Sequence, residues 1–514
     1  MNTGLPYLSL ITFLPLAGSL VVLLLPKAHQ RAMKITAIGA SVASLLLTFC
    51  AWTRFVPNAG MMYVERYTWI SALHVDYHLG VDGLSIALVL LTAIITPLAM
   101  LAHWKLKENV KLFFFLFLLL QTGMFGVFTA LNFFHWFIYW ELGLIPMFFL
   151  IKIWGHENRT YASFKFFLYT LAGSIGMLVA FGFLWMATGT FDFIELRALA
   201  ANGELGKKLA EFAVRWHWNP STFASVLFWA VVVGFAIKVP IWPFHTWLPD
   251  AHTQAPTGGS MVLAAILLKM GVYGFLRVVL PIFPAQVAAH VDALLLLALA
   301  SIVLGAFAAL AQTDFKRLVA YSSVNHMGYS MLGIFAVAVS GDLNDRSAAL
   351  NGAVLQMFNH GISSAALFFM VGVIYDRTHT RALADYGGLR KIMPIYAGVL
   401  GVSMFSSLGL PGLNGFVGEF LIFRGVFPVV TTVSVVAMIG LVVTAVFLLQ
   451  MMQKVCFGPL NEKWQFLPDM TARELFIGGA LMLFMFLIGI YPAPLLDAAN
   501  NAVMGLVKLF EVMR

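Results

Sequence analysis

Six ionisable side chains lie in separate, otherwise apolar stretches of the sequence, and their types suit proton transfer. They are Glu141, Lys238, Lys269, His326, His360 and Glu419. A charged residue at the centre of a bilayer costs about 2.5–3.5 kcal/mol on insertion scales, so a function is the default explanation for each one. The pKa of a lysine moves readily on burial, and histidine titrates near neutral pH. The set therefore predicts one polar axis that carries protons.

Lys238 stands two residues before Pro240, at the end of an apolar segment. A proline in a helix removes a backbone donor and leaves the carbonyl four residues earlier, here that of Ala236, without its partner. Such a break at membrane depth is tolerated only inside protein or beside a water-filled cavity. We expect a half-helix that ends at Lys238, with Glu141 as its counter-charge. The alternative is a structural lysine held permanently on the free carbonyls.

Lys269, His326 and His360 extend this pattern along three further apolar segments. No carboxylate lies within one helical turn of Lys269, and Ser, Asn and Tyr residues surround the two histidines. These neighbours suit a proton wire, although a single histidine in a helix is often only a hydrogen-bonded core group. We expect these three residues in the middle of the polar axis.

Glu419 follows a second break, at Pro411 and Gly412. A half-helix that starts near Phe416 would place this carboxylate at the positive end of the helix dipole, whereas a start at Pro411 would weaken that argument. We expect Glu419 to be the terminal proton site, near the outer side.

His135 and the two cysteines are assigned structural roles. His245 and His252 lie seven residues apart in a proline-rich stretch, and we expect no metal there. His135 lies near a helix end. Cys50 and Cys456 are the only two cysteines and are read as small buried hydrophobes, whereas an iron–sulfur cluster usually needs four. No redox centre is therefore expected in this chain.

The composition is that of a membrane protein. Of the 514 residues, 61% are hydrophobic and 11% are charged, whereas soluble chains have roughly 25% charged residues. The net charge of +8 is therefore an orientation signal and not evidence of nucleic-acid binding.

Apolar runs long enough to cross a bilayer predict an all-α polytopic fold with about 14 transmembrane helices. The expected spans are residues 8–25, 34–53, 83–102, 110–130, 132–151, 161–187, 221–239, 257–280, 291–313, 317–338, 350–375, 393–424 (broken), 431–453 and 474–492.

Helical breaks near Pro240 and Pro411 occupy corresponding places in two sets of five spans. This arrangement predicts two inverted repeats, and paired broken helices in such repeats mark the transport site. The predicted organisation is an N-terminal three-helix segment, two repeats, and a C-terminal helix with its tail, at residues 1–109, 110–280, 281–457 and 458–514.

Alternate loops differ in charge. One set of loops holds 18 Lys and Arg residues and the other set, with both termini, holds 10. The positive-inside rule places the first set in the cytoplasm and both termini outside. Residues 8–25 are expected to be a permanent span and not a cleaved signal. One short amphipathic helix is expected within 188–220, and another in the tail 495–514, against a partner.

Several motifs together resemble one family, the antiporter-like membrane subunits of respiratory complex I. The motifs are Trp140-Glu141-Leu142, Lys238–Thr257 with its Trp-Leu-Pro-Asp-Ala-His block, Leu268–Tyr273, Tyr321–Tyr329 and Leu410–Phe420. The resemblance extends over nearly the whole chain. One related subunit of the complex continues into a long lateral helix, and another usually has a lysine where Glu419 stands. This chain has neither feature, so it is expected to resemble the third antiporter-like subunit.

The resemblance implies 14 spans with two inverted repeats, broken seventh and twelfth helices, and a coupled Glu141–Lys238 pair. It also implies a central relay of Lys269, His326 and His360, with Glu419 as the exit residue. The implied activity is proton translocation within NADH:quinone oxidoreductase, beside two homologous subunits. NADH, FMN, iron–sulfur clusters and quinone are then expected in partner subunits, in a bacterial inner membrane or, as the alternative, a mitochondrial one.

Two other functions stay open at this point. A subunit of a multisubunit Na⁺/H⁺ antiporter would have nearly the same motifs. A structural membrane scaffold with an inactive channel is a third reading, which buried ions on so many segments disfavour because each costs insertion energy.

Overall fold

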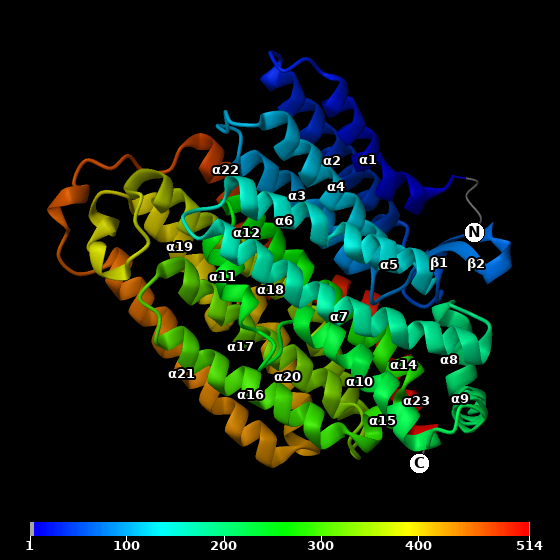
Figure 1. Cartoon of the computed structure of the whole chain (residues 1–514). Coiled ribbons are helices and arrows are strands. Elements are labelled where there is room, and N and C mark those ends of the chain that lie inside the picture. The colour runs from blue at the N-terminus through cyan, green and yellow to red at the C-terminus, as the bar shows by residue number, and fades with distance from the viewer. Residues whose placement is uncertain (1–4, 513–514) are drawn as a thin grey trace.

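The computed structural model of the chain describes residues 5–512, and helices dominate it (Figure 1). In chain order the helices and strands are α1 (Tyr7–Leu24), α2 (Gln30–Thr53), β1 (Met62–Ile70), β2 (Val75–Val81), α3 (Ile86–Ala102), α4 (Val110–Thr129), α5 (Phe133–Leu142), α6 (Leu144–Trp154), α7 (Arg159–Thr188), α8 (Phe193–Ala201), α9 (Glu204–Arg215), α10 (Pro220–Lys238), α11 (Trp247–Gln254), α12 (Thr257–Val262), α13 (Leu268–Gly274), α14 (Leu280–Ile282), α15 (Pro284–Ala289), α16 (Val291–Leu310), α17 (Phe315–Ala336), α18 (Leu343–Thr378), α19 (Pro394–Leu408), α20 (Asn414–Val429), α21 (Thr431–Cys456), α22 (Ala472–Ile490) and α23 (Ala493–Val512). Two π-helical segments, η2 (Leu263–Leu267) and η3 (Phe275–Val279), join α12, α13 and α14.

Each predicted span coincides with helical structure, so the polytopic helical prediction is confirmed. Within residues 5–512, eleven continuous helical stretches are long and apolar enough to cross a membrane. Three predicted spans fall outside that set. Helix α3 is 17 residues long, the pair α19 and α20 is interrupted, and α17 carries polar residues along its length.

Helix boundaries follow local capping chemistry. Side chains of Asn132, Asn219, Asp314 and Asp342 accept backbone N–H bonds at the starts of α5, α10, α17 and α18. Each satisfies donors that the first turn leaves without partners. At α22 the hydroxyl of Thr471 and the carboxylate of Glu474 form a capping box.

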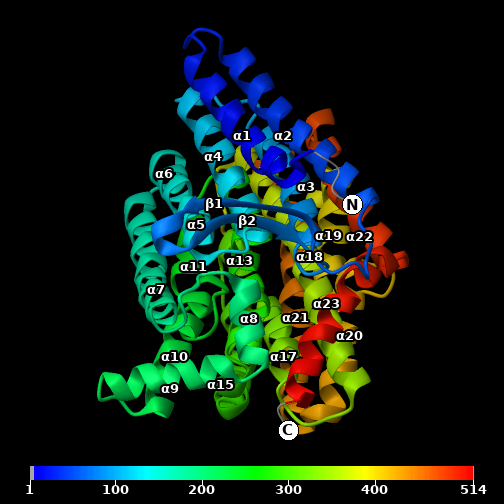
Figure 2. The ribbon, with the colours of Figure 1, turned by 90° about the vertical axis from the view of Figure 1, so that its right-hand side faces the viewer.

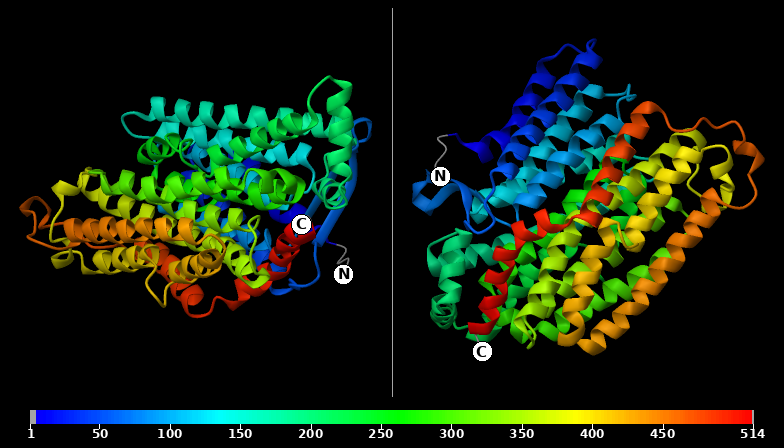
Figure 3. Two further views of the ribbon diagram at one scale, coloured as in Figure 1. Left: turned by 90° about the horizontal axis from the view of Figure 1, so that it is seen from below. Right: turned by 180° about the vertical axis from the view of Figure 1, so that it is seen from behind.

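The centre of the bundle is formed by the continuous helical stretch 257–282 and by α18. The most apolar 18-residue window of each is entirely buried, whereas the corresponding windows of α2, α7, α21 and α22 are 28–39% buried. Figure 3 shows the outer helices packed around this centre. Lys269 and His360 lie on these two central stretches, so the fold buries both side chains within protein.

A β-hairpin covers one end of the bundle, and the prediction of an all-helical chain was wrong in this detail. Strands β1 and β2 pair antiparallel and cross in front of α5 and α13 in the view of Figure 2. The aromatic and β-branched run from Met62 to Ile70 is typical of a strand. This strand of 9 residues is much shorter than the apolar runs of about 20 residues that predict membrane helices, so that criterion does not detect it.

The segment 188–220 and the C-terminal tail also differ from prediction. The segment forms two short helices, α8 and α9, and not one. Helix α23 packs against this chain itself. Val503, Val507 and Phe510 are buried there, and Asn351 of α18 donates to Asn500 over 2.9 Å. One face of the tail helix therefore packs on its own chain; residues 513–514 lie outside the described part.

Asp192 joins the hairpin to the start of α8. One carboxylate oxygen accepts from the backbone N–H groups of Ile194 and Glu195, and the other lies 2.5 Å from the Nδ1 of His78 in β2. Burial acts to raise the pKa of Asp192, but the hydrogen bond and charge of His78, together with the two backbone donors, lower it overall.

The Asp192→Asn variant should therefore lose stability in a pH-dependent way. Asparagine still caps α8 but carries no charge, and a hydrogen bond to a charged group contributes about 2 kcal/mol. The carboxylate's contribution is complete above the ordinary aspartate pKa near 4 and disappears as the pH falls through the lowered folded value. The temperature of half-aggregation of the purified complex should be lower for the variant at pH 7 and should approach that of the native protein at low pH.

Asp76→Asn is the matched control for this experiment, because it removes a carboxylate from an exposed pair with Arg66 in the same hairpin. Equal losses in the two variants at pH 7 would contradict the assigned role of Asp192.

Candidate proton-transfer site

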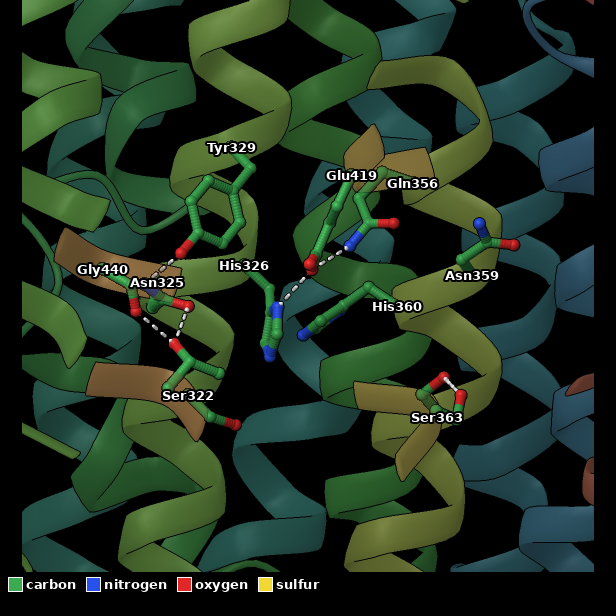
Figure 4. A network of polar contacts seen from close by, with 12 residues as sticks. Ser322, Asn325, His326, Tyr329, Gln356, Asn359, His360, Ser363, Glu419 and Gly440 are labelled. Atoms are coloured by element: carbon green, nitrogen blue, oxygen red, sulfur yellow. Dashed lines mark hydrogen bonds and ion pairs between the residues drawn. The ribbon is translucent and has the colours of Figure 1, made fainter. Parts of the chain in front are cut away.

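Four of the six predicted site residues lie together in the centre of the bundle. The Nζ of Lys269 is 2.5 Å from the Nδ1 of His360, and the Nδ1 of His326 is 2.9 Å from a carboxylate oxygen of Glu419. The rings of His326 and His360 have centroids 5.6 Å apart. Figure 4 shows the two rings side by side, with Glu419 pointing toward His326. Residues from helices α13, α17, α18 and α20 thus form one series, here called the relay.

The π-helical segment η2 helps to position Lys269. Its wider turn shifts the register of the helix, and the Nζ of Lys269 donates to the carbonyl of Ala264, five residues earlier, over 2.7 Å. This lysine is completely buried. The carbonyl and the ring nitrogen of His360 are the polar partners that make its burial possible.

A buried amide and hydroxyl cluster closes the break between α19 and α20. The amide of Asn414 donates to the carbonyl of Asn359, and the amide of Asn359 donates to the carbonyl of Asn414. The hydroxyls of Ser363 and Ser406 complete the cluster. These bonds fix the start of α20 against α18. Because α20 begins at Asn414, Glu419 lies in its second turn, so the dipole argument made for Glu419 is weakened.

Gln356 is a site residue that the sequence reading missed. It lies one turn before His360 on α18, and its amide donates to the same oxygen of Glu419 that contacts His326, over 3.0 Å. Its position four residues from His360 was the available signal, since residues at this spacing share a helix face. Asn325 was missed too: it donates to the carbonyl of Ile302 and accepts from Thr444, and so fixes α17 beside α16 and α21.

Glu141 and Lys238 lie near each other but apart from the relay. The charge of each residue acts electrostatically on the other, yet within residues 5–512 no ion pair within 4.0 Å joins them. The Nζ of Lys238 lies over the ring of Trp140, 5.1 Å from its centroid. One carboxylate oxygen of Glu141 is buried without a hydrogen-bond partner. The two charges therefore interact through space, and the predicted direct pairing is not the geometry of this structure.

The carbonyls at the end of α10 are not free, in contrast to the prediction. The N–H of Ile241 donates to the carbonyl of Ala236 over 2.8 Å, and the indole N–H of Trp247 donates to the carbonyl of Ile237 over 2.8 Å. The chain after Lys238 bends back and supplies these donors itself, as buried backbone groups require. At this break, the carbonyls of Ala236 and Ile237 are hydrogen-bonded, and α10 ends at Lys238.

Glycine allows the two lysine-bearing helices to touch. A Cβ at Gly271 would lie 3.0 Å from the Cβ of Lys238 and 2.9 Å from a methyl of Val239. Lys238 and Lys269 are therefore on adjoining helices. Across residues 5–512, no hydrogen bond or ion pair connects Lys238 to the relay, so the two polar groups touch only through the helices that carry them.

His252 lies beside the relay on its other side. The side chain is completely buried, its ring stacks on Phe368 at 4.3 Å, and neither ring nitrogen has a hydrogen-bond partner. Lys269 and Lys316 are charged neighbours of His252. From the sequence we expected only that His252 binds no metal, and its neighbourhood now makes it a candidate relay member.

A polar pocket of about 260 Å³ lies at the end of the bundle where the Lys- and Arg-rich loops gather. His156, Asp314, Tyr375 and Arg381 are among its lining residues. The hydroxyl of Tyr375 is 3.3 Å from the Nδ1 of His156. Burial, and then the positive charges of Lys316 and Arg381, lower the pKa of His156 to about 3. His156 is therefore neutral at pH 7 and can accept hydrogen bonds from water in the pocket.

Two further sequence assignments can be compared with the structure. Cys456 is buried as predicted, but Cys50 is exposed on α2, so its reading as a buried hydrophobe was wrong. His135 is buried against Tyr77, with ring centroids 5.2 Å apart. Among residues 5–512, no three His, Cys, Asp or Glu side chains come together as a metal site.

Comparisons with known proteins identify the family. A model described as NADH:quinone oxidoreductase/Mrp antiporter, TM, matches residues 130–447, and one described as NADH-ubiquinone oxidoreductase chain 4, amino terminus, matches residues 10–127. The chain belongs to the NADH:quinone oxidoreductase/Mrp antiporter family, which confirms the resemblance seen in its motifs.

Individual relatives narrow the comparison within that family. The chain is 44% identical to NADH-quinone oxidoreductase subunit M of Rhodobacter capsulatus, over 98% of this chain and 97% of the relative. It is similar to a chain of respiratory complex I from Thermus thermophilus, with 27% identity, a TM-score of 0.84, and coverage of 98% and 99%. A chain of the Mrp complex from a Dietzia species shares the fold at 24% identity and a TM-score of 0.79, covering 97% of this chain and 52% of that one.

Gly271→Ala should destabilise the chain by separating the helices that carry the two lysines. The added methyl would meet backbone and Cβ atoms that cannot move freely, and overpacking of this kind costs about 1–3 kcal/mol. Gly182→Ala on α7 is the control, because no atom lies within 4 Å of its added Cβ. We expect a lower temperature of half-aggregation and less assembled complex for Gly271→Ala only. Identical behaviour of the two variants would mean that the close contact at Gly271 is not a constraint.

Proposed function

We propose that this chain is a proton-translocating membrane-arm subunit of NADH:quinone oxidoreductase, in a bacterial inner membrane beside homologous antiporter-like subunits. The observation that carries the proposal is the relay of Lys269, His360, His326 and Glu419, on four helices in the interior of the bundle. Membership of the family and 44% identity to a subunit M over nearly the full chain support it. The redox groups that drive the movement belong to partner subunits.

The relay can pass protons because each member can be both donor and acceptor. Lys269 and the Nδ1 of His360 are close enough to share one proton. The Nε2 atoms of His360 and His326 are buried without protein partners, so water between the two rings can complete the connection. His326 then exchanges a proton with Glu419, which Gln356 holds in place.

Glu141 and Lys238 act as an electrostatic valve on this relay. When Glu141 is charged, it favours the protonated Lys238, and when Glu141 is neutralised, that support is lost. The ammonium of Lys238 lies over an aromatic ring and has no ion pair within 4.0 Å, so its charge depends strongly on distant charges. Because α10 packs against α13, a change at Lys238 acts on Lys269 over a short distance.

The polar axis lies where two inverted repeats meet, within a set of 14 spans. The repeats are 110–280 and 281–457, flanked by the three-helix segment 1–109 and the C-terminal part 458–514. Support comes from the two interrupted helices, each of which ends or begins beside a relay or valve residue. The pocket that contains His156 and Tyr375 is the proposed proton entry from the cytoplasm, and Glu419 leads to the outer side.

A subunit of a multisubunit Na⁺/H⁺ antiporter is the second candidate function, since a chain of an Mrp complex has the same fold. Copurification distinguishes the two. A membrane complex that carries this chain together with flavin and iron–sulfur subunits supports the first proposal, whereas small membrane subunits without such groups, and Na⁺-dependent proton exchange without NADH, would replace it with the second. A structural scaffold is tested by the two variants that follow.

Lys238→Met should nearly abolish proton translocation driven by NADH. The variant keeps the apolar stem but removes the charge to which Glu141 responds, and general acid–base groups contribute about 100-fold or more. Proton uptake into inside-out membrane vesicles, measured with a pH-sensitive dye and normalised to assembled complex, should fall at least about tenfold. Lys207→Met, at an exposed position of α9, is the control. Uptake near the native level, with assembly intact, would support the scaffold reading.

Glu419→Gln should slow the same uptake by a smaller factor. Glutamine preserves the shape and the hydrogen bonds to His326 and Gln356 but cannot take up a proton. A rise in the barrier of about 1 kcal/mol corresponds to a rate about fivefold lower. Glu419→Asp, which keeps the titratable group, should recover part of the activity. If the glutamine variant pumps as fast as the native protein, Glu419 is not the terminal site.

A further inference from the structure

A second site lies far from the relay, at the Lys- and Arg-rich end of α1, α2 and α4. A pocket of about 380 Å³ is lined there by polar residues on one part and apolar residues on the other. Lys27, Gln30, Asn109 and Lys111 form the polar part. The apolar part consists of Leu23, Met33, Val110 and Leu112. This lining suits a molecule with a charged head and an apolar body.

The cations in and near this pocket form no salt bridge within residues 5–512, although Asp376 is a charged neighbour of Lys105. None of Lys27, Arg31, Lys105, Lys107 and Lys111 forms an ion pair within the described residues. Glu108 is the only acidic residue in the loop between α1 and α2 (25–29) and the loop between α3 and α4 (103–109). The surplus of positive charge is therefore available to an anion from outside the chain.

Lys34, at the start of α2 near these loops, contrasts with the pocket lysines because its ammonium is held by backbone carbonyls. Lys34 is buried, and its Nζ donates to the carbonyls of Trp104 and Leu106 over 2.6 Å each. It thereby ties α2 to the end of α3. Lys27 is exposed and makes no such bond, and Lys111 uses one donor on the carbonyl of Leu23. The pocket lysines thus retain free donors beside an anchored one.

Two helices begin at this pocket without side-chain caps. The side chains of His29 before α2 and Asn109 before α4 accept no hydrogen bond from the first turn of their helices. The free backbone N–H groups add to the attraction for a phosphate. Apolar residues Leu20, Val21 and Leu24 of α1 are 54%, 47% and 84% exposed beside the pocket, where acyl chains would lie.

We propose that this pocket binds the headgroup of an anionic glycerophospholipid, with Lys27 and Lys111 on its phosphate and the acyl chains along α1. A free phosphate ion would use the lysines but not the apolar half of the lining. Basic pockets between membrane helices on the cytoplasmic side bind anionic headgroups, with about 1 kcal/mol for each Lys or Arg near the surface, or about fivefold in affinity. The site is independent of the proposed proton path.

The test uses the intact complex in phosphatidylcholine vesicles that contain a photoactivatable phosphatidylglycerol, with the diazirine near the glycerol end of one acyl chain. After illumination and chymotrypsin digestion, mass spectrometry should locate labels in residues 20–35 and 105–115. Labelling there should exceed that by a photoactivatable phosphatidylcholine by about fivefold or more. Equal labelling by the two lipids, or no labelling by either because another subunit covers the pocket, would overturn the proposal.

Lys27→Gln combined with Lys111→Gln should reduce labelling by the anionic probe to the level of the neutral one. Lys207→Gln combined with Lys208→Gln, an exposed and a partly buried lysine of α9, is the matched control and should leave labelling unchanged. Inorganic phosphate at 50 mM separates a lipid site from an ion site: labelling that persists supports the lipid, and labelling that disappears rejects it. If the double variant does not assemble, the comparison of the two lipids on the native complex still decides.

Discussion

The burial of charge in an apolar bundle is the constraint on which the rest of this structure depends. Lys269 has no exposed surface, and the helical stretch that carries it is enclosed by protein along its most apolar window. An isolated charge in such a place would be very costly, so it must be surrounded by polar partners or lose its proton. The π-helical turn before Lys269, the ring of His360 and the second histidine meet this requirement. In the proposed function, the same partners are the groups with which the lysine exchanges a proton.

Interrupted helices satisfy the constraint at two other places without leaving backbone groups unpaired. After Lys238 the chain bends back, so that Ile241 and Trp247 donate to the last carbonyls of α10. Between α19 and α20, the amides of Asn359 and Asn414 bond to each other's backbone. Each break brings a titratable side chain to the bundle interior with its surrounding backbone already hydrogen-bonded. Rigid breaks of this kind allow the charge on the side chain to change while the fold does not.

The relay and the Glu141–Lys238 group are two separate polar groups and not one continuous hydrogen-bonded chain. The relay is linked by hydrogen bonds and ring contacts, whereas Glu141 and Lys238 act on each other through space and adjoin the relay through helix packing, as at Gly271. A charge change at the first group can therefore alter the second without a proton passing between them. This division is a physical basis for coupling, because electrostatic effects extend further in a low-dielectric interior than in water.

The sequence by itself determined the helical membrane architecture, the positions of both breaks and the identity of the six titratable residues. Each depends on local chemistry: apolar length, proline geometry and the cost of a charge in lipid. Only the tertiary structure decided that four of the six residues form one relay while Glu141 and Lys238 lie apart, that Gln356 and His252 belong to the same region, and that α23 packs on its own chain. It also revealed the hairpin and the pairing of His78 with Asp192. These features depend on contacts between residues that are far apart in the chain, and spacing along a single helix carries no information about which face of another helix it will meet.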